Sequence, residues 1–273
     1  MADPYNKVID ERQLIAKAAK ELTLLGDETK EITTRSRELV KEELKAIEWS
    51  LIIIYAVFQK VGSEYSSDPI DDQRKACLLL CSHIFKLILT CKEHFLSGYY
   101  DICRTYFRDF NEAINQLRAC AKDDKTAKKW LARKKISAEI KRLNPLPANL
   151  DFTDEIEGFL QSTGHPSMNV AEGSVSFSPN LESAEIHLWP YYDEMQCRQS
   201  ALLVSGEAVN CAIWAAISLQ GYLEDKGQIA LECQQLHDYR TDTLFKRLDL
   251  LRNDLDIRNK SVLENLNQSK SSN

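Results

Sequence analysis

Glycine and proline are scarce in this sequence, and their positions limit its fold more than any other feature. The chain holds only 9 Gly and 7 Pro, and most of them lie near residues 62–69, 144–147 and 158–190. The long runs between these stretches are rich in Leu, Ala, Glu and Lys, which favour helix. The sequence therefore predicts an all-α protein, a multi-helix bundle whose helices are joined at a few defined breaks.

The breaks divide the chain into three predicted regions. Residues 1–67 are predicted to form an N-terminal helical arm, residues 68–224 a helical core, and residues 225–273 a C-terminal helix with a polar tail. Within the core, residues 145–190 are predicted to be an irregular insertion, because they hold most of the prolines. The segments SVSFS and AEIHLW, near 174–188, alternate in the manner of strands and are expected to pair as one small β-hairpin.

Apolar patterning indicates which helices are buried. The run CLLLCSHIFKLIL, at residues 77–89, is apolar almost all round and predicts a central helix that starts at an Asp-Pro pair, residues 68–69. Residues 49–58 are apolar on most sides, so that part of the arm is also predicted to be buried. A short Ser-Gly joint at residues 97–98 predicts an antiparallel hairpin between the central helix and the next one.

Charge and hydropathy indicate a cytoplasmic protein that does not enter a membrane. The net charge of −6 argues against non-specific binding of nucleic acid by the whole surface. The first twenty residues are charged and lack the apolar centre of a secretory signal. The apolar run at 51–58 is far shorter than the roughly 20 residues that cross a bilayer.

The eight cysteines are predicted to be reduced and buried. Most lie in apolar helical runs and no CxxC pair occurs, a pattern typical of thiols that pack as small apolar groups in the cytosol. Cys77 and Cys81 share a helix face near His83, but a metal site would need two more ligands that the sequence does not identify. Motifs for serine hydrolases, phosphate loops and zinc peptidases are absent, so no metal and no cofactor is predicted.

A polar pair marks the helix that follows residue 98. Arg108 and Glu112 lie one helical turn apart and can contact each other beside an aromatic-rich apolar face. The favoured interpretation is a structural ion pair that faces the core. The alternative is an active site in which Arg108, Glu112 and His165 converge, with His165 as general acid or base and Arg108 as a phosphate clamp.

The segment from 125 to 142 is strongly basic, with eight Lys or Arg against one Glu. A basic stripe that carries an aromatic side chain can hold phosphates and stack a base. The candidate nucleic-acid-binding residues are Lys128, Lys129, Trp130, Arg133, Lys134 and Lys135. The favoured interpretation is instead a solvated helix face that Trp130 anchors to the core.

Three motifs spread over residues 75–215 resemble those of a group of uncharacterised bacterial all-helical proteins. They are Gly98-Tyr99 followed by Arg108-x-x-x-Glu112, then Trp130-Leu131 with a basic tail, and Ser162-x-x-His165-Pro166-Ser167. The resemblance implies a helical core that carries the Arg/Glu pair, with the His-Pro loop packed near it. It implies no activity.

The helical layout is also similar to that of HEPN-type domains, some of which are ribonucleases. Their active site uses an Arg followed five positions later by a His. The residues five positions before the histidines of this chain are Leu78, Leu89, Leu160, Glu182 and Glu232. Because none of them is Arg, the likeness is limited to layout and argues against a HEPN-type nuclease.

These features leave three functions open. The main hypothesis is a helical protein that acts through protein–protein contacts or self-association, because both ends of the chain are long amphipathic helices. A seam for a partner helix, within or between chains, is predicted from Leu244, Leu248, Leu251 and Leu255. The alternatives are a nuclease or other hydrolase of a bacterial stress or phage-defence system, and a nucleic-acid-binding accessory protein.

Overall fold

The described part of the protein is an all-α bundle, which confirms the predicted fold class. The computed structural model describes residues 27–63, 70–144, 175–177, 184–186, 190–223, 226–254, 256–257 and 260. The main helices are α2 (Lys41–Ser63), α3 (Asp72–Leu96), α4 (Tyr100–Lys122), α9 (Glu194–Leu219) and α10 (Lys226–Tyr239). A further helix, at 27–39, leads into α2 through a turn at Val40.

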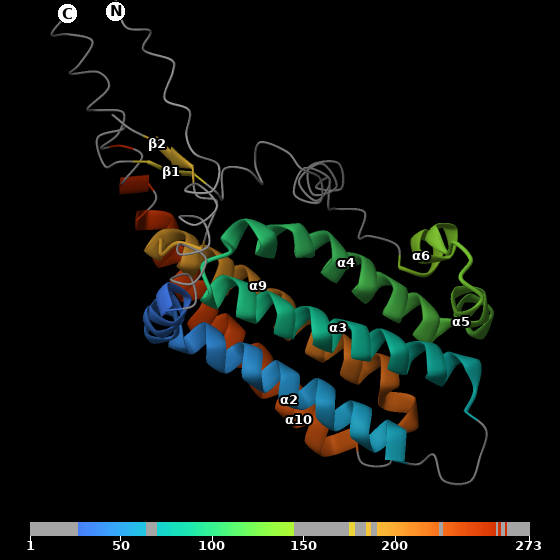
Figure 1. The fold of residues 1–273 in the computed structure, drawn as a ribbon. Coiled ribbons are helices and arrows are strands. Elements are labelled where there is room, and N and C mark those ends of the chain that lie inside the picture. Colours follow the sequence, from blue (N-terminus) through green and yellow to red (C-terminus); the bar gives the residue numbers. More distant parts are fainter. Residues whose placement is uncertain are drawn as a thin grey trace, which may run out of the picture.

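The five main helices share one hydrophobic core. Helix α3 lies between α2 and α4, and α9 packs against all three and against α10 (Figure 1). Buried side chains from every one of these helices belong to a single cluster. Residues 27–63, which the sequence assigned to an arm, therefore contribute to the core, and so does the start of the C-terminal region.

Smaller elements complete the fold. Helices α5 (Asp124–Leu131) and α6 (Ser137–Leu143) follow α4 at one end of the bundle (Figure 1). Strand β1 (Val175–Phe177) pairs antiparallel with β2 (Ala184–Ile186), within the segment where the sequence predicts a hairpin. A 3-10 turn (Gln220–Tyr222) ends α9, and a π-helical turn (Arg240–Leu244) joins α10 to the helix that continues to residue 254.

Gly98 makes the predicted α3–α4 hairpin possible. Its φ is +85°, in the left-handed region where glycine is favoured. A Cβ at this position would lie 2.5 Å from the carbonyl oxygen of Tyr191, so the backbone before α9 closes on the turn. The tight turn brings α4 back along α3, as the sequence predicts.

Helix α3 begins later than the Asp-Pro pair at 68–69 predicts. Its cap is Asp71, whose carboxylate accepts a hydrogen bond of 2.7 Å from the backbone N–H of Arg74. Ile70 and Asp71 precede the helix, and residues 64–69 lie outside the described part of the chain. The helix thus begins at Asp72, three to four residues after the predicted start.

Two apolar surfaces differ from expectation. Ile52 and Tyr55 in the apolar run of α2 are 65% and 56% exposed, so the prediction that this run is buried is wrong for its outer face. Leu79 of α3 is 50% exposed, so the predicted central helix also presents one face to solvent. By contrast, Leu244 and Leu251 of the C-terminal seam are buried in the core of their own chain.

One described helical segment, Glu194–Tyr222, is long and apolar enough to cross a membrane. Its most apolar window has a mean hydropathy of 1.6, and half of that window is buried. Helix α9 packs against α2, α3, α4 and α10. A helix in the core of a bundle can have the same length and composition as a membrane-spanning helix.

The cysteines carry no disulfide, and seven of the eight are buried. Burial raises the pKa of Cys77 and of Cys91 to about 12, which keeps both thiols protonated and unreactive at neutral pH. Among the described residues no three His, Cys, Asp or Glu side chains are placed to hold a metal ion.

Candidate functional site

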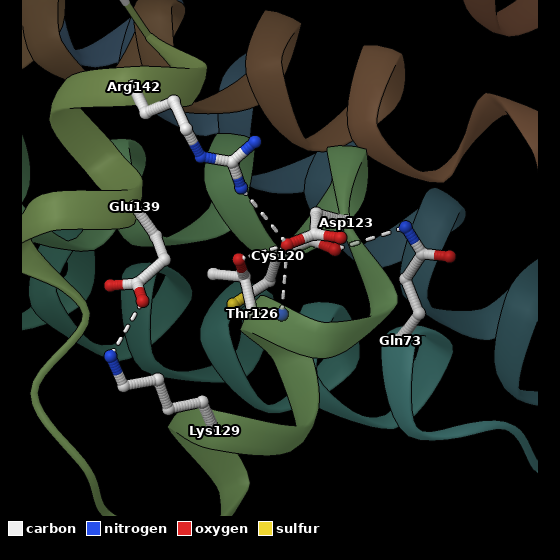
Figure 2. Close-up of polar contacts among 7 residues, drawn as sticks. All are labelled: Gln73, Cys120, Asp123, Thr126, Lys129, Glu139 and Arg142. Carbon is white, nitrogen blue, oxygen red and sulfur yellow. Dashed lines mark hydrogen bonds and ion pairs between the residues drawn. The ribbon is translucent and has the colours of Figure 1, made fainter.

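A polar network centred on Asp123 fixes α5 and α6 to the end of α4 (Figure 2). The Asp123 carboxylate accepts hydrogen bonds from the backbone N–H and the hydroxyl of Thr126, at 3.2 and 2.5 Å, and so caps α5. Arg142 of α6 contacts the same carboxylate at 3.4 Å. The bond from the Thr126 hydroxyl and the nearby Arg142 charge lower the pKa of Asp123. Gln73 of α3 donates a 3.1 Å bond to the carbonyl oxygen of Cys120, which ties this corner to the bundle.

Two of the candidate nucleic-acid-binding cations form ion pairs within this corner. Lys128 forms an ion pair with Asp124 at 2.7 Å, one helical turn away in α5. Lys129 joins α5 to α6 through a 2.6 Å contact with Glu139, and this hydrogen bond lowers the pKa of Glu139. Both lysines are therefore matched by local acids, and Lys129 holds the two short helices together.

The next three cations are placed differently. Arg133, Lys134 and Lys135 follow one another in the loop between α5 and α6, and all three are exposed. Within the described ranges none of their side chains forms an ion pair or a hydrogen bond. The basic segment thus contains three paired cations on α5 and α6, namely Lys128, Lys129 and Arg142, and three consecutive cations in the loop whose side chains have no partner among the described residues.

The loop breaks the continuous basic helix that the sequence suggests. Arg133 has a φ of 57°, in the left-handed region. Its N–H donates to the carbonyl of Trp130 at 2.8 Å, and the N–H of Lys134 donates to the carbonyl of Lys129 at 3.1 Å. This pair of bonds is the Schellman motif that ends many helices, usually with glycine at the left-handed position. An arginine there costs roughly 1–2 kcal/mol of backbone strain.

The loop borders a groove of about 820 Å³ that opens against α3 and α4, which we call the basic groove. It is lined by Lys75, Leu79, Glu112, Gln116, Trp130, Leu131, Arg133, Lys134, Lys135, Ile136, Ser137 and Ile140. Four of these side chains are cations, namely Lys75 and residues 133–135, and Glu112 is the single acid in the lining. Lys75 also lacks an ion pair with any described residue. The groove therefore combines an apolar floor with an excess of positive charge.

Trp130 forms one wall of the basic groove and is fixed in place. Its indole N–H donates to the Gln116 side-chain oxygen at 2.9 Å, and the Gln116 amide donates to Glu112 at 3.1 Å. The ring is partly buried and packs against the hydrophobic core. Trp130 thus anchors α5 to α4, as the solvated-face interpretation predicted, while its outer edge lines the groove.

The prediction that Arg108 and Glu112 face the core is wrong. Both side chains are exposed on α4, because the buried face of this helix is taken by the apolar residues beside them. Glu112 instead orients Gln116 at the edge of the basic groove. His165 lies outside the described residues, so its predicted approach to Arg108 and Glu112 stays a prediction.

A second hollow adjoins the basic groove on the other side of α3. This apolar hollow, of about 810 Å³, lies between α2 and α3 and is lined by residues that include Phe58, Ile70 and Leu78. Lys75 and Leu79 line both hollows. We call the combined surface, from the apolar hollow across Leu79 to the basic groove, the α3 face.

Sequence reasoning missed Lys75, Leu79 and Gln116 as parts of this surface. A signal for Leu79 was present, because residues 77–81 read Cys-Leu-Leu-Leu-Cys. Successive residues of a helix are rotated by about 100°, so five consecutive apolar side chains surround the helix and at least one must point outward. The sequence carries no comparable signal for Gln116.

The α3 face has the chemistry of a binding surface. It offers exposed apolar area, unpaired cations and a fixed tryptophan, but the described residues that line it include no paired acid and base of the kind used for proton transfer. Comparison with protein-family models, with curated proteins and with solved structures finds no match to this chain. The likeness to bacterial helical proteins stays a prediction.

Proposed function

We propose that this protein works by binding a second protein, and that the α3 face is its contact surface. The observation that carries the proposal is Leu79, a large apolar side chain left 50% exposed where two hollows meet. Burial of such a side chain by a partner is a principal source of binding free energy.

The composition of the α3 face supports a protein partner. Interfaces are enriched in aromatic residues and arginine around an apolar centre with a polar rim. Here Leu79 lies at the centre, Trp130 and Phe58 lie on the two sides, and Arg133 lies on the rim.

A different protein fits the α3 face better than a second copy of this chain. In a symmetric dimer the same patch is used by both subunits. Pairing two basic grooves would bring the unpaired cations of residues 133–135 toward the same residues of the other copy. Like charges that face each other across an interface disfavour the pairing.

Cross-linking tests the proposal directly, because the α3 face carries its own reactive lysines. Lys75, Lys134 and Lys135 line the basic groove and are exposed. We expect an amine-reactive cross-linker, added to the protein in extract of the cells that make it, to join these lysines to one partner protein. The Leu79→Lys variant should lose those cross-links, because it places a charge at the apolar centre.

A matched variant separates the α3 face from general surface hydrophobicity. Leu250 is 62% exposed on the helix after α10, towards the opposite end of the bundle from α5 and α6 (Figure 1). The Leu250→Lys variant should keep the cross-links. The proposal is wrong if both variants form the same cross-links as the natural chain. Circular dichroism of each variant checks that the helical content is unchanged.

A further inference from the structure

We propose that the segment bound in the basic groove is an acidic amphipathic helix of the partner protein. This inference rests on the proposed function and adds the chemistry of the partner. The apolar side of such a helix would cover Leu79 and its neighbours, and its carboxylates would meet Lys75 and residues 133–135.

Charge is the first reason for an acidic partner. The chain as a whole carries a net charge of −6, yet the lining of the basic groove holds four cations against one acid. A short acidic segment meets only this local excess of positive charge. It is attracted to the groove with little repulsion from the rest of the surface.

The cations in the loop are free to act on a ligand. Lys128 and Lys129 are matched by acids of the same corner, whereas residues 133–135 have no side-chain partner among the described residues. Binding an acidic segment therefore breaks no ion pair between residues that the structure describes. Arg133 also presents a planar donor that can hold a carboxylate with two hydrogen bonds.

The floor of the groove explains why the segment should be amphipathic. Leu79, Leu131, Ile136 and Ile140 contribute apolar surface beneath the cations. A peptide of acidic residues alone would leave that apolar surface exposed to water. An amphipathic helix presents apolar residues at every third or fourth position along one side and would cover it. The apolar and the basic parts of the groove then each contact a matching side of the ligand.

A single nucleic-acid strand fits these observations less well. Base stacking needs the open face of an aromatic ring, and Trp130 is packed against the core and held by Gln116.

A displayed library of short helix-forming peptides, free to vary at every position, tests the inference without knowledge of the partner. The full-length protein is the target, and enriched peptides are then measured by fluorescence anisotropy. We expect enriched peptides with net negative charge and with apolar residues spaced i, i+3 or i+4, and i+7. Their affinity should fall as salt is raised.

Two triple variants assign the binding to the groove. The groove variant combines Arg133→Gln, Lys134→Gln and Lys135→Gln. The matched variant combines Lys125→Gln, Lys128→Gln and Lys141→Gln, which removes the same total charge from residues outside the lining of the groove. We expect the groove variant to bind the enriched peptides at least about tenfold more weakly, as for charge pairs at an interface, and the matched variant to stay within about threefold of the natural chain.

Three results would overturn the inference. They are enrichment of neutral or basic peptides, an equal loss of affinity in both triple variants, and displacement of the enriched peptide by a single-stranded oligonucleotide. A fourth result separates this inference from the proposed function. The groove variant lacks Lys134 and Lys135, so its cross-links are read at Lys75. If Leu79→Lys abolishes the partner cross-link at Lys75 but the groove variant keeps it, the α3 face binds a protein that is not held by its acids.

Discussion

The substitution Arg133→Gly should stabilise the fold while it weakens partner binding. Arg133 has a φ of 57°, where a residue with a side chain is strained by roughly 1–2 kcal/mol and glycine is not. Glycine makes the unfolded chain more flexible, which offsets about 0.5–1 kcal/mol of that gain. The difference predicts an increase of roughly 0.5–1 kcal/mol in the free energy of unfolding. In a chain of this size the increase corresponds to a rise in Tm of about 1–4 °C.

Urea unfolding followed by circular dichroism measures the change, and two variants control for it. Lys134→Gly removes one positive charge from the same loop, but the only described residues with positive φ are Gly98 and Arg133. Lys134→Gly should therefore lower the free energy of unfolding, by up to about 1 kcal/mol. Arg133→Ala removes the charge and keeps the strain, so its stability should stay close to that of the natural chain. All three variants should weaken the cross-linking of the partner.

The decisive outcome is a change in the free energy of unfolding that is positive for Arg133→Gly and negative for Lys134→Gly. If Arg133→Gly destabilises the protein as much as Lys134→Gly does, the left-handed turn carries no strain and the reasoning is refuted. If Arg133→Gly is more stable but binds the partner as well as the natural chain, the strain is real and the charge of Arg133 does not contribute to binding.

Three further substitutions test the corner network, the hairpin and a half-buried acid. Asp123→Ala should lower the urea midpoint more than Asp124→Ala does, because it removes the cap of α5. Folding lowers the pKa of Asp123, so the difference between the two midpoints should shrink as pH falls through the acidic range. Gly98→Ala should cost about 2–4 kcal/mol in thermal unfolding, because left-handed strain adds to a clash with the backbone of Tyr191. Burial raises the pKa of Glu207, so its ionised form opposes folding and stability falls as pH rises through the carboxyl range. Glu207→Gln should flatten that fall between pH 4 and pH 7, and an unchanged pH profile would show that Glu207 does not cause it.

Much of the fold follows from local patterns in the sequence. The apolar face of α4 is set by residues such as Phe107, Phe110 and Leu117, which recur every three or four positions and are all buried. The turn at Ser97-Gly98 could be predicted from the sequence, because only glycine adopts the positive φ of this position without strain. These features depend on a few consecutive residues, and sequence reasoning therefore places them correctly.

The features that build the α3 face depend on contacts between distant segments or on an exception to a local rule. Helix α5 ends at Leu131, and Arg133 takes the left-handed position after it where glycine is usual, so the basic segment carries no sequence signal for the loop. The apolar runs around Ile52 and Leu79 were read as buried, although a helix that packs on one side must leave part of such a run exposed. The groove itself requires α3, α4 and the α5–α6 loop to meet, which no pattern within any one of them specifies.

The most direct test of the proposed α3 face is a lysine footprint in extract of the cells that make the protein. Acetylation of each lysine is compared between this extract and the purified chain, with Lys125 and Lys141 as exposed reference sites outside the groove. Binding of a protein on the α3 face predicts slower acetylation of Lys75, Lys134 and Lys135 in the extract, and no change at the two reference sites. Equal rates at all five lysines in the extract and in the purified chain would contradict it.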